Sequence, residues 1–237
     1  MDVFSWDGTI SSRDFYAAAR AFADKWNRSN HGFPPWTWVP SPKHHHLGLP
    51  LNQVNGYLIL EKLCLAESTD QEHLSSKEDL DIDELTQARN EEVIFSKEGE
   101  PVDSATLVEG NSAGVHHYDF HIVYIASYRV PVLYFRAYWN DGQPLVLDEI
   151  EKDLPASSAK VLLESKWTFI TQEEHPHLNR PWYKLHPCGT SEWMKLLFQS
   201  DTSLAKNGVS LELYLVSWLS VVGQVVGLKI PSELLKH

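Results

Sequence analysis

The sequence predicts an α+β fold, with one helix before an antiparallel β meander and further helices after it. Two adjacent runs, 115–128 and 130–139, are rich in β-branched and aromatic residues and indicate the meander. Residues 11–26 repeat apolar side chains at helical spacing, and residues 211–231 are a mostly apolar stretch of helical length. Together these observations determine the predicted class.

The first element is a helix over residues 11–26. Ser11 or Ser12 can cap its first turn, and the carboxylate of Asp14 suits the positive end of the helix dipole. One face is apolar, which predicts that it is buried. That face is formed by Phe15, Ala18, Ala19, Phe22 and Trp26.

Two strands are predicted between this helix and the middle of the chain. A connection rich in proline and histidine, over 33–50, contains one short strand at 36–39. Residues 56–67 alternate well enough to form the second strand. One of its faces is expected to carry Leu58, Leu60, Lys62 and Cys64, which makes Cys64 a structural residue inside an apolar strand.

Residues 67–113 form an acidic block, which is predicted to be a flexible insertion in a single domain over 1–237. The block has 14 acidic and 3 basic residues, a net charge of −11 out of the chain's −12. Dense like charge and few aromatic residues oppose burial, so a solvated loop with a short helix near 79–90 is expected. A docking segment is the alternative interpretation.

Short elements and turns are predicted after the meander. Residues 140–144 form a tight turn, and Asp148 can cap a helix that begins at 149. A further helix is expected over 158–167. An irregular stretch follows it, and the last strand covers 182–185.

Two helices complete the predicted fold. Residues 190–199 form the first, with Thr190 or Ser191 as its cap. Residues 211–231 form the second, which Gly227 closes. Because four polar residues interrupt its apolar run, a buried helix is predicted here and not a transmembrane span. They are Glu212, Ser217, Ser220 and Gln224.

Composition and motifs exclude several functional classes. Outside the acidic block the chain has 18 acidic and 17 basic residues, so it lacks the basic surface that nucleic-acid binding needs. It has no glycine-rich phosphate loop or dinucleotide fingerprint, so neither ATP nor another cofactor is expected. The N-terminal sequence has no basic segment before an apolar run, and only two cysteines are present, which predicts a reducing, cytoplasmic location.

Cys188 is the residue that points most directly to chemistry. It follows a rigid His-Pro step and precedes the helix at 190–199, where unpaired backbone N–H groups and the helix dipole favour a thiolate. Gly189 leaves room for a large partner beside the sulfur. Local physics leaves two interpretations open, a nucleophile and a buried structural cysteine.

The histidines do not indicate a metal centre. The run at 44–46 is expected at the surface, and none of the 12 histidines matches the ligand spacing of zinc sites, so no metal is expected. His175 and His186 each precede a proline. Each has two open interpretations, an imidazole base for Cys188 or a turn-forming residue.

Several stretches resemble the autophagy branch of the ubiquitin-like-conjugating enzymes, in which a His-Pro-Cys carries the thioester-forming cysteine. The first two are EEHPHL at 173–178 and LHPCGT at 185–190. Three more resemble the autophagy-related protein 10 family in order as well as composition: SYRVPVLYFRAYWNDGQPL at 127–145, WTFITQEEHPHL at 167–178 and SWLSVVGQVVGLKIP at 217–231. Together they cover most of residues 115–231.

The resemblance implies a ubiquitin-conjugating-enzyme-like fold and a two-step acyl transfer. Cys188 would accept the modifier, autophagy-related protein 12, from the activating enzyme, autophagy-related protein 7, as a thioester. A lysine of autophagy-related protein 5 would then attack the thioester and form an isopeptide bond, in support of autophagosome formation. A non-catalytic adaptor of the same fold and a cysteine hydrolase are the alternatives.

The groups around the thioester are less well defined by the resemblance. Conventional ubiquitin-conjugating enzymes place a His-Pro-Asn tripeptide before their cysteine, and this chain has none. The auxiliary candidates are His186, Gln172, Thr171 and Asn140. The acceptor is expected to dock on the hairpin at 115–139, through an open outer edge and Arg136, the lone charge between aromatic residues on its strand.

Overall fold

The computed structural model describes residues 5–29, 32–41, 55–65, 115–160, 169–200 and 210–235. By its internal contacts the chain divides into two units, Met1–Ser68 with Gly114–His237 and Thr69–Ala113, and every described residue belongs to the first. The acidic block at 67–113 lies outside the described residues. Its prediction as a flexible insertion in a single domain therefore stays a prediction.

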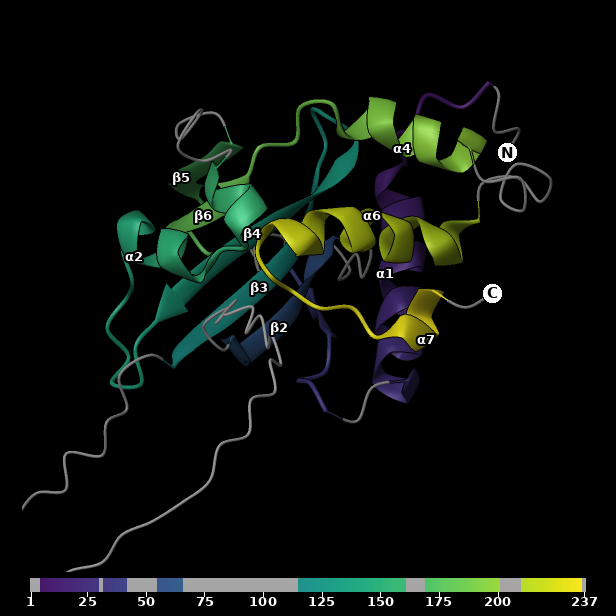
Figure 1. The fold of residues 1–237 in the computed structure, drawn as a ribbon. Coiled ribbons are helices and arrows are strands. Elements are labelled where there is room, and N and C mark those ends of the chain that lie inside the picture. The colour runs from purple at the N-terminus through teal and green to yellow at the C-terminus, as the bar shows by residue number, and fades with distance from the viewer. Residues whose placement is uncertain are drawn as a thin grey trace, which may run out of the picture. The chain divides into compact units, whose positions relative to one another are not determined.

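The described chain forms one antiparallel sheet flanked by helices, which confirms the predicted α+β class (Figure 1). The sheet has six strands in the order β1-β2-β3-β4-β6-β5, and each neighbouring pair is antiparallel. The strands are β1 (Thr37–Pro40), β2 (Gly56–Leu65), β3 (His116–Ile125), β4 (Val130–Tyr138), β5 (Ile170–Glu174) and β6 (Pro181–Leu185).

Helices precede and follow the sheet, as predicted. They are α1 (Ser12–Ser29), α2 (Leu147–Asp153), α4 (Thr190–Ser200), α6 (Leu211–Val225) and α7 (Ser232–Leu235). Residues 156–160 are also helical, and the rest of the helix predicted over 158–167 lies outside the described residues. The cap predicted for α1 is present, because Oγ of Ser11 accepts a hydrogen bond from N–H of Asp14 at 3.1 Å.

One face of the sheet carries the main hydrophobic core. Alternate residues of β3 and β4 point to this side, because side chains alternate along a strand. α1 and α6 pack against each other, and both contribute to this core together with α4 (Figure 1). The predicted apolar face of α1 is buried there. Other large buried members are Phe120 and Phe135 from the sheet, and Phe198 and Trp218 from the helices.

The opposite face carries a smaller core, which includes Tyr57, Tyr134 and Trp182. The connection between β5 and β6 contributes to it, because the ring of His177 stacks on Tyr57 at a centroid distance of 4.8 Å. Nδ1 of His177 also lies 2.9 Å from Oγ of Ser41, just after β1. These contacts join the two ends of the strand order across the sheet face.

Cys64 is exposed, so its predicted placement inside an apolar strand is wrong. The cause is an irregularity in β2 between Leu60 and Leu63, where Lys62 adopts a φ of +57°. N–H of Lys62 donates to the carboxylate of Asp119 on β3 at 2.9 Å, which stabilises this bulge. The extra residue reverses the faces of the strand beyond it, so Leu63 is buried and Cys64 points outward.

Two local predictions were wrong in detail. The stretch predicted to be irregular contains β5, an edge strand whose last residues are polar and exposed. The helix predicted to follow Asp148 begins one residue before it, at Leu147. Its start is stabilised by Glu149, whose carboxylate accepts a hydrogen bond from N–H of Val146 at 2.9 Å.

The hairpin formed by β3 and β4 has no open outer edge, contrary to the prediction. β2 pairs with the outer side of β3, and β6 pairs with the outer side of β4. The edges of the described sheet are β1 and β5 instead. Strand addition by a partner is therefore blocked along β3 and at Tyr134 and Phe135 of β4.

The apolar helix α6 ends as predicted. Gly227 adopts a φ of +70°, which favours glycine, and N–H of Leu228 donates back to the carbonyl of Gly223 at 2.9 Å. Six residues of α6 are buried. In the part of the chain that the structure describes, no helix has the length and apolar character needed to cross a membrane.

Candidate active site

Cys188 lies at the tip of a tight turn between β6 and α4. The turn is anchored on both sides, because Pro187 and Thr190 are buried while Cys188 and Gly189 are exposed. N–H of Thr190 donates to the carbonyl of Pro187 at 3.1 Å, and Gly189 adopts a φ of +76°. The interpretation of Cys188 as a buried structural residue is therefore wrong, because its thiol is free and exposed.

His186 contacts the backbone of Cys188. Nδ1 of His186 accepts a hydrogen bond from N–H of Cys188 at 3.2 Å. The backbone N–H of His186 donates to the carbonyl of Phe169 at 3.1 Å, just before β5. The ring of Tyr128, which is 48% exposed in the turn between β3 and β4, lies edge-on to His186 at 6.4 Å.

The N-terminal segment 5–11 packs against the first turn of α4, a contact that the sequence did not predict. Gly8 has a φ of +82°, and a Cβ atom there would lie 1.8 Å from the carbonyl oxygen of Ser191. The hydroxyl of Tyr214 on α6 donates to the carbonyl of Gly8 at 3.2 Å. The segment thus links α6 to the helix that immediately follows Cys188.

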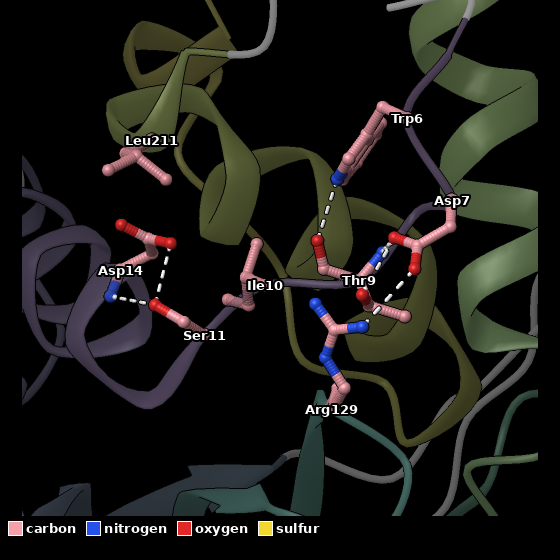
Figure 2. Close-up of a pocket in the computed structure, with 8 residues that line it drawn as sticks. All are labelled: Trp6, Asp7, Thr9, Ile10, Ser11, Asp14, Arg129 and Leu211. Atoms are coloured by element: carbon pink, nitrogen blue, oxygen red, sulfur yellow. Dashed lines mark hydrogen bonds and ion pairs between the residues drawn. The ribbon is translucent and has the colours of Figure 1, made fainter. Parts of the chain in front are cut away.

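The same segment holds the turn between β3 and β4. N–H of Ile10 donates to the carbonyl of Arg129 at 3.0 Å, and the hydroxyl of Tyr124 donates to the carbonyl of Ile10 at 3.0 Å. The guanidinium of Arg129 lies 3.3 Å from the carboxylate of Asp7 (Figure 2). The two elements beside Cys188, α4 and this turn, are therefore tied together by one stretch of chain.

A pocket of about 430 Å³ lies beside this segment (Figure 2). The hydroxyl and N–H of Thr9 hydrogen-bond to the carboxylate of Asp7 at 2.7 and 3.0 Å and lower the pKa of Asp7, with a further contribution from Arg129. The lining is mixed, with apolar side chains, two carboxylates and one guanidinium. It consists of Trp6, Asp7, Thr9, Ile10, Ser11, Asp14, Arg129 and Leu211.

His175 is not a base for Cys188, because its side chain is fully buried in the smaller core. Its Nε2 lies 3.1 Å from Nδ1 of His121 on β3. Burial, together with the neighbouring His175, lowers the pKa of His121 to about 2. Of the two histidines proposed as a base, only His186 touches Cys188 or its backbone.

Asn140 lies at the other end of the sheet from Cys188. Because β4 and β6 are antiparallel, Cys188, which follows β6, is on the side where β4 begins. Asn140 follows the end of β4 at Tyr138, and the strand itself spans roughly 25 Å. The amide oxygen of Asn140 is bound by Nε2 of His117 at 2.6 Å instead.

Thr171 and Gln172 lie on β5, beside the strand that leads to Cys188. They pair with Lys184 and Tyr183, which precede Cys188 by four and five residues, or roughly 13 and 17 Å along an extended chain. The hydroxyl of Thr171 lies 3.3 Å from the carboxylate of Glu173. Of the four auxiliary candidates, the structure therefore brings only His186 to Cys188.

Arg136 takes part in a network on the sheet face with the smaller core. Its guanidinium lies 2.8 Å from the carboxylate of Asp119, which is buried, and 4.8 Å above the ring of Trp182. The hydroxyl of Tyr138 donates to the same carboxylate at 2.7 Å. Arg136 thus forms an ion pair with the buried carboxylate of Asp119.

The residues described contain no group of three or more His, Cys, Asp or Glu side chains that is arranged to hold a metal ion. The buried pair His116 and Asp153, with Nδ1 to Oδ2 at 2.6 Å, also receives the hydroxyl of Tyr118. That carboxylate is therefore occupied within the fold.

The family described as "Autophagocytosis associated protein, active-site domain" matches residues 14–233. The chain belongs to this family. The match begins in α1, ends in α7 and includes every described strand and helix between them.

Two similar proteins are described as ubiquitin-like-conjugating enzymes. The ubiquitin-like-conjugating enzyme ATG10 of Arabidopsis thaliana is 52% identical over 229 residues, which is 97% of this chain and 96% of that protein. The enzyme of the same name from Homo sapiens is 42% identical over 132 residues, 55% of this chain and 58% of that protein. A solved chain described as "Crystal structure of Autophagic E2, Atg10" has a TM-score of 0.48 and 13% identity, and covers 93% of this chain and 99% of its own. Membership of the family and the near full-length relative support a conjugating-enzyme role in autophagy.

Proposed function

We propose that this family member is a cysteine-dependent acyltransferase whose nucleophile is Cys188. The observation that carries the proposal is the exposed thiol at the tip of a turn, anchored by buried Pro187 and Thr190. A large protein partner can approach such a thiol, since Gly189 beside it has no side chain and open space around it. Two free thiols are compatible with a reducing compartment, and we place the reaction in the cytoplasm.

The proposed reaction has two steps. In the first, the thiolate of Cys188 attacks the thioester carbonyl that joins the modifier to its activating enzyme, and the activating enzyme's thiolate leaves. In the second, a neutral lysine amine of the acceptor attacks the new thioester, loses a proton, and expels the thiolate of Cys188 as the isopeptide bond forms. We assign autophagy-related protein 12 as the modifier, autophagy-related protein 7 as the activating enzyme and autophagy-related protein 5 as the acceptor.

Formation of the thioester tests the nucleophile. Incubated with activating enzyme, modifier and ATP, the chain is expected to form an adduct that dithiothreitol removes. Cys188→Ser should give a more stable ester and Cys188→Ala no adduct. Cys64→Ser is the matched control, because Cys64 is also exposed, and it should charge normally. Normal charging of Cys188→Ala would refute the assignment.

The same assay separates the alternatives. An adaptor forms no adduct with modifier at either cysteine. A cysteine hydrolase cleaves the modifier's C-terminus and accumulates no thioester when acceptor is withheld. A conjugating enzyme accumulates the thioester and discharges it only when the acceptor is added.

We further propose Arg136 as a contact for the acceptor, through its partly exposed guanidinium. Its side chain is 38% exposed over the face that carries Trp182. In a single-turnover discharge from precharged protein, Arg136→Ala should slow transfer. Asp119→Asn is the control, since it weakens the same network without removing the guanidinium. Equal slowing by both variants would mean that Arg136 acts only through the fold.

A further inference from the structure

The turn that presents Cys188 is closed by a side chain from within the turn itself. Nδ1 of His186 accepts from N–H of Cys188, two residues later, at 3.2 Å. Asparagine and aspartate close turns in the same way, with a side-chain oxygen that accepts from the N–H two residues on. The imidazole of His186 therefore occupies the place of a turn-forming side chain.

This hydrogen bond determines the tautomer of the neutral ring. A nitrogen that accepts from N–H carries its lone pair there, so the proton of a neutral His186 lies on Nε2. In that tautomer Nδ1 is occupied by the backbone and Nε2 is a donor. Neither ring nitrogen is then free to take the proton of the Cys188 thiol.

The surroundings of His186 hold the ring in this position. Its own N–H is bound to the carbonyl of Phe169, and the ring of Tyr128 lies edge-on to it with an interplanar angle of 76°. Pro187 restricts the backbone immediately after it and is buried. His186 is thus held at the entry to β5 through its backbone and at the turn between β3 and β4 through its ring.

We propose that His186 is a positioning residue, whose Nδ1 holds the backbone of Cys188 so that the thiol stays at the exposed tip of the turn. This inference rests on the proposed function, because it takes Cys188 to be the nucleophile. It assigns His186 the role of a hydrogen-bond acceptor to the backbone and not that of an acid or base.

Three substitutions, His186→Asn, His186→Gln and His186→Ala, separate these roles. Asn at 186 keeps an acceptor at the position of Nδ1, whereas Gln keeps a polar group nearer the position of Nε2. His186→Asn should form the thioester within about twofold of the wild-type rate, while His186→Gln and His186→Ala should be slower by about five- to tenfold, the range expected for one lost hydrogen bond. Normal rates in His186→Gln with a loss in His186→Asn would overturn the proposal, as would normal rates in all three variants.

A second measurement needs no partner protein. Nitrogen NMR of the isotope-labelled full chain, with His186→Asn for assignment, should show His186 with its proton on Nε2 and a protected amide at Cys188. His186→Ala should lose that protection, and His186→Asn should keep it. A proton on Nδ1 in the neutral ring would overturn the inference. If the wild-type chain fails to charge but these signals are as expected, the proposed function is wrong and the structural role of His186 stands.

Discussion

Gly8 lies against the backbone of α4 with no room for a side chain. Alanine at this position would combine an unfavourable positive φ with a clash against the carbonyl of Ser191. We expect Gly8→Ala to lower the free energy of unfolding by about 2–4 kcal/mol, measured by urea denaturation. Because Ser191 lies three residues after Cys188, the same variant should also form the thioester more slowly.

Gly142 provides the matched control for this prediction. It has a similar positive φ of +87°, but nothing lies within 4 Å of the place where a Cβ atom would be. Gly142→Ala should therefore cost only the conformational strain, about 1–2 kcal/mol. Equal losses in the two variants would show that the contact between Gly8 and Ser191 is not tight.

At the scale of single residues, the sequence predicted the parts of the site that depend on neighbours in the chain. The His-Pro step, Gly189 and the following helix start allow either a nucleophile or a buried structural cysteine at 188, and only the resemblance favours the nucleophile. The packing of Gly8 against Ser191 was not predictable, because the two residues are far apart in the sequence and a lone glycine has no pattern. The distance of Asn140 from Cys188 likewise depends on how β4 and β6 pair.

Two ion pairs between aspartate and arginine differ in burial and should differ in stability. Asp119, which also accepts from Lys62 and Tyr138, is buried, whereas Asp7 and Arg129 are both exposed. Asp119→Ala leaves three donors without their acceptor and should cost about 2–3 kcal/mol in urea denaturation. Asp7→Ala should cost about 0–1 kcal/mol, and a loss as large as that of Asp119→Ala would contradict this account.

The buried His121 should make the fold sensitive to acid. In the native state the pKa of His121 is lowered to about 2, so its ring stays neutral at pH 5. An unfolded histidine has a pKa of about 6.5 and takes up a proton below that pH. The contribution of His121 to the free energy of unfolding is therefore full above pH 6.5 and is lost as the pH falls below it. Between pH 7 and pH 5 the free energy of unfolding should drop by about 2 kcal/mol more in the wild type than in His121→Asn. An equal drop in both proteins would show that His121 is not kept neutral.

Among the elements, those with a strong period were predicted well and those set by distant contacts were not. α1 and the β3–β4 hairpin follow directly from their helical and alternating patterns. β5 was missed because an edge strand needs no apolar alternation, and its residues from Gln172 to Glu174 are exposed. The prediction for the face of β2 that carries Cys64 was wrong, because the bulge in β2 is stabilised by Asp119, which belongs to the next strand.

For the whole molecule, the α+β class was predictable from the order of elements along the chain. The strand order was not, since β6 reaches β4 only after a long connection that includes α2. This pairing and that of β2 with β3 occupy the outer sides of the hairpin, where an open edge was expected. The pairing of β6 with β4 also placed Cys188 beside the start of β4 and not beside its end.

Deletion of roughly residues 70–108 tests the predicted insertion. The described strands on either side of it are neighbours, because Leu65 at the end of β2 pairs directly with His116 at the start of β3. The residues left between them are enough for a hairpin loop. If the block is a solvated loop, as its composition predicts, the melting temperature should stay within a few degrees. A loss of ten degrees or more, by calorimetry, would show that the block is packed.

The pairing of Leu65 with His116 also has a consequence for the speed of folding. The two strands are neighbours in the sheet, yet about 50 residues of chain separate them, so this contact must close a long loop. Two-state folding rates fall as contacts become more distant along the chain. The shortened protein should consequently refold faster after dilution from urea, because a shorter loop loses less entropy when it closes. Its unfolding rate should be nearly unchanged, because the loop is expected to be closed already in the transition state.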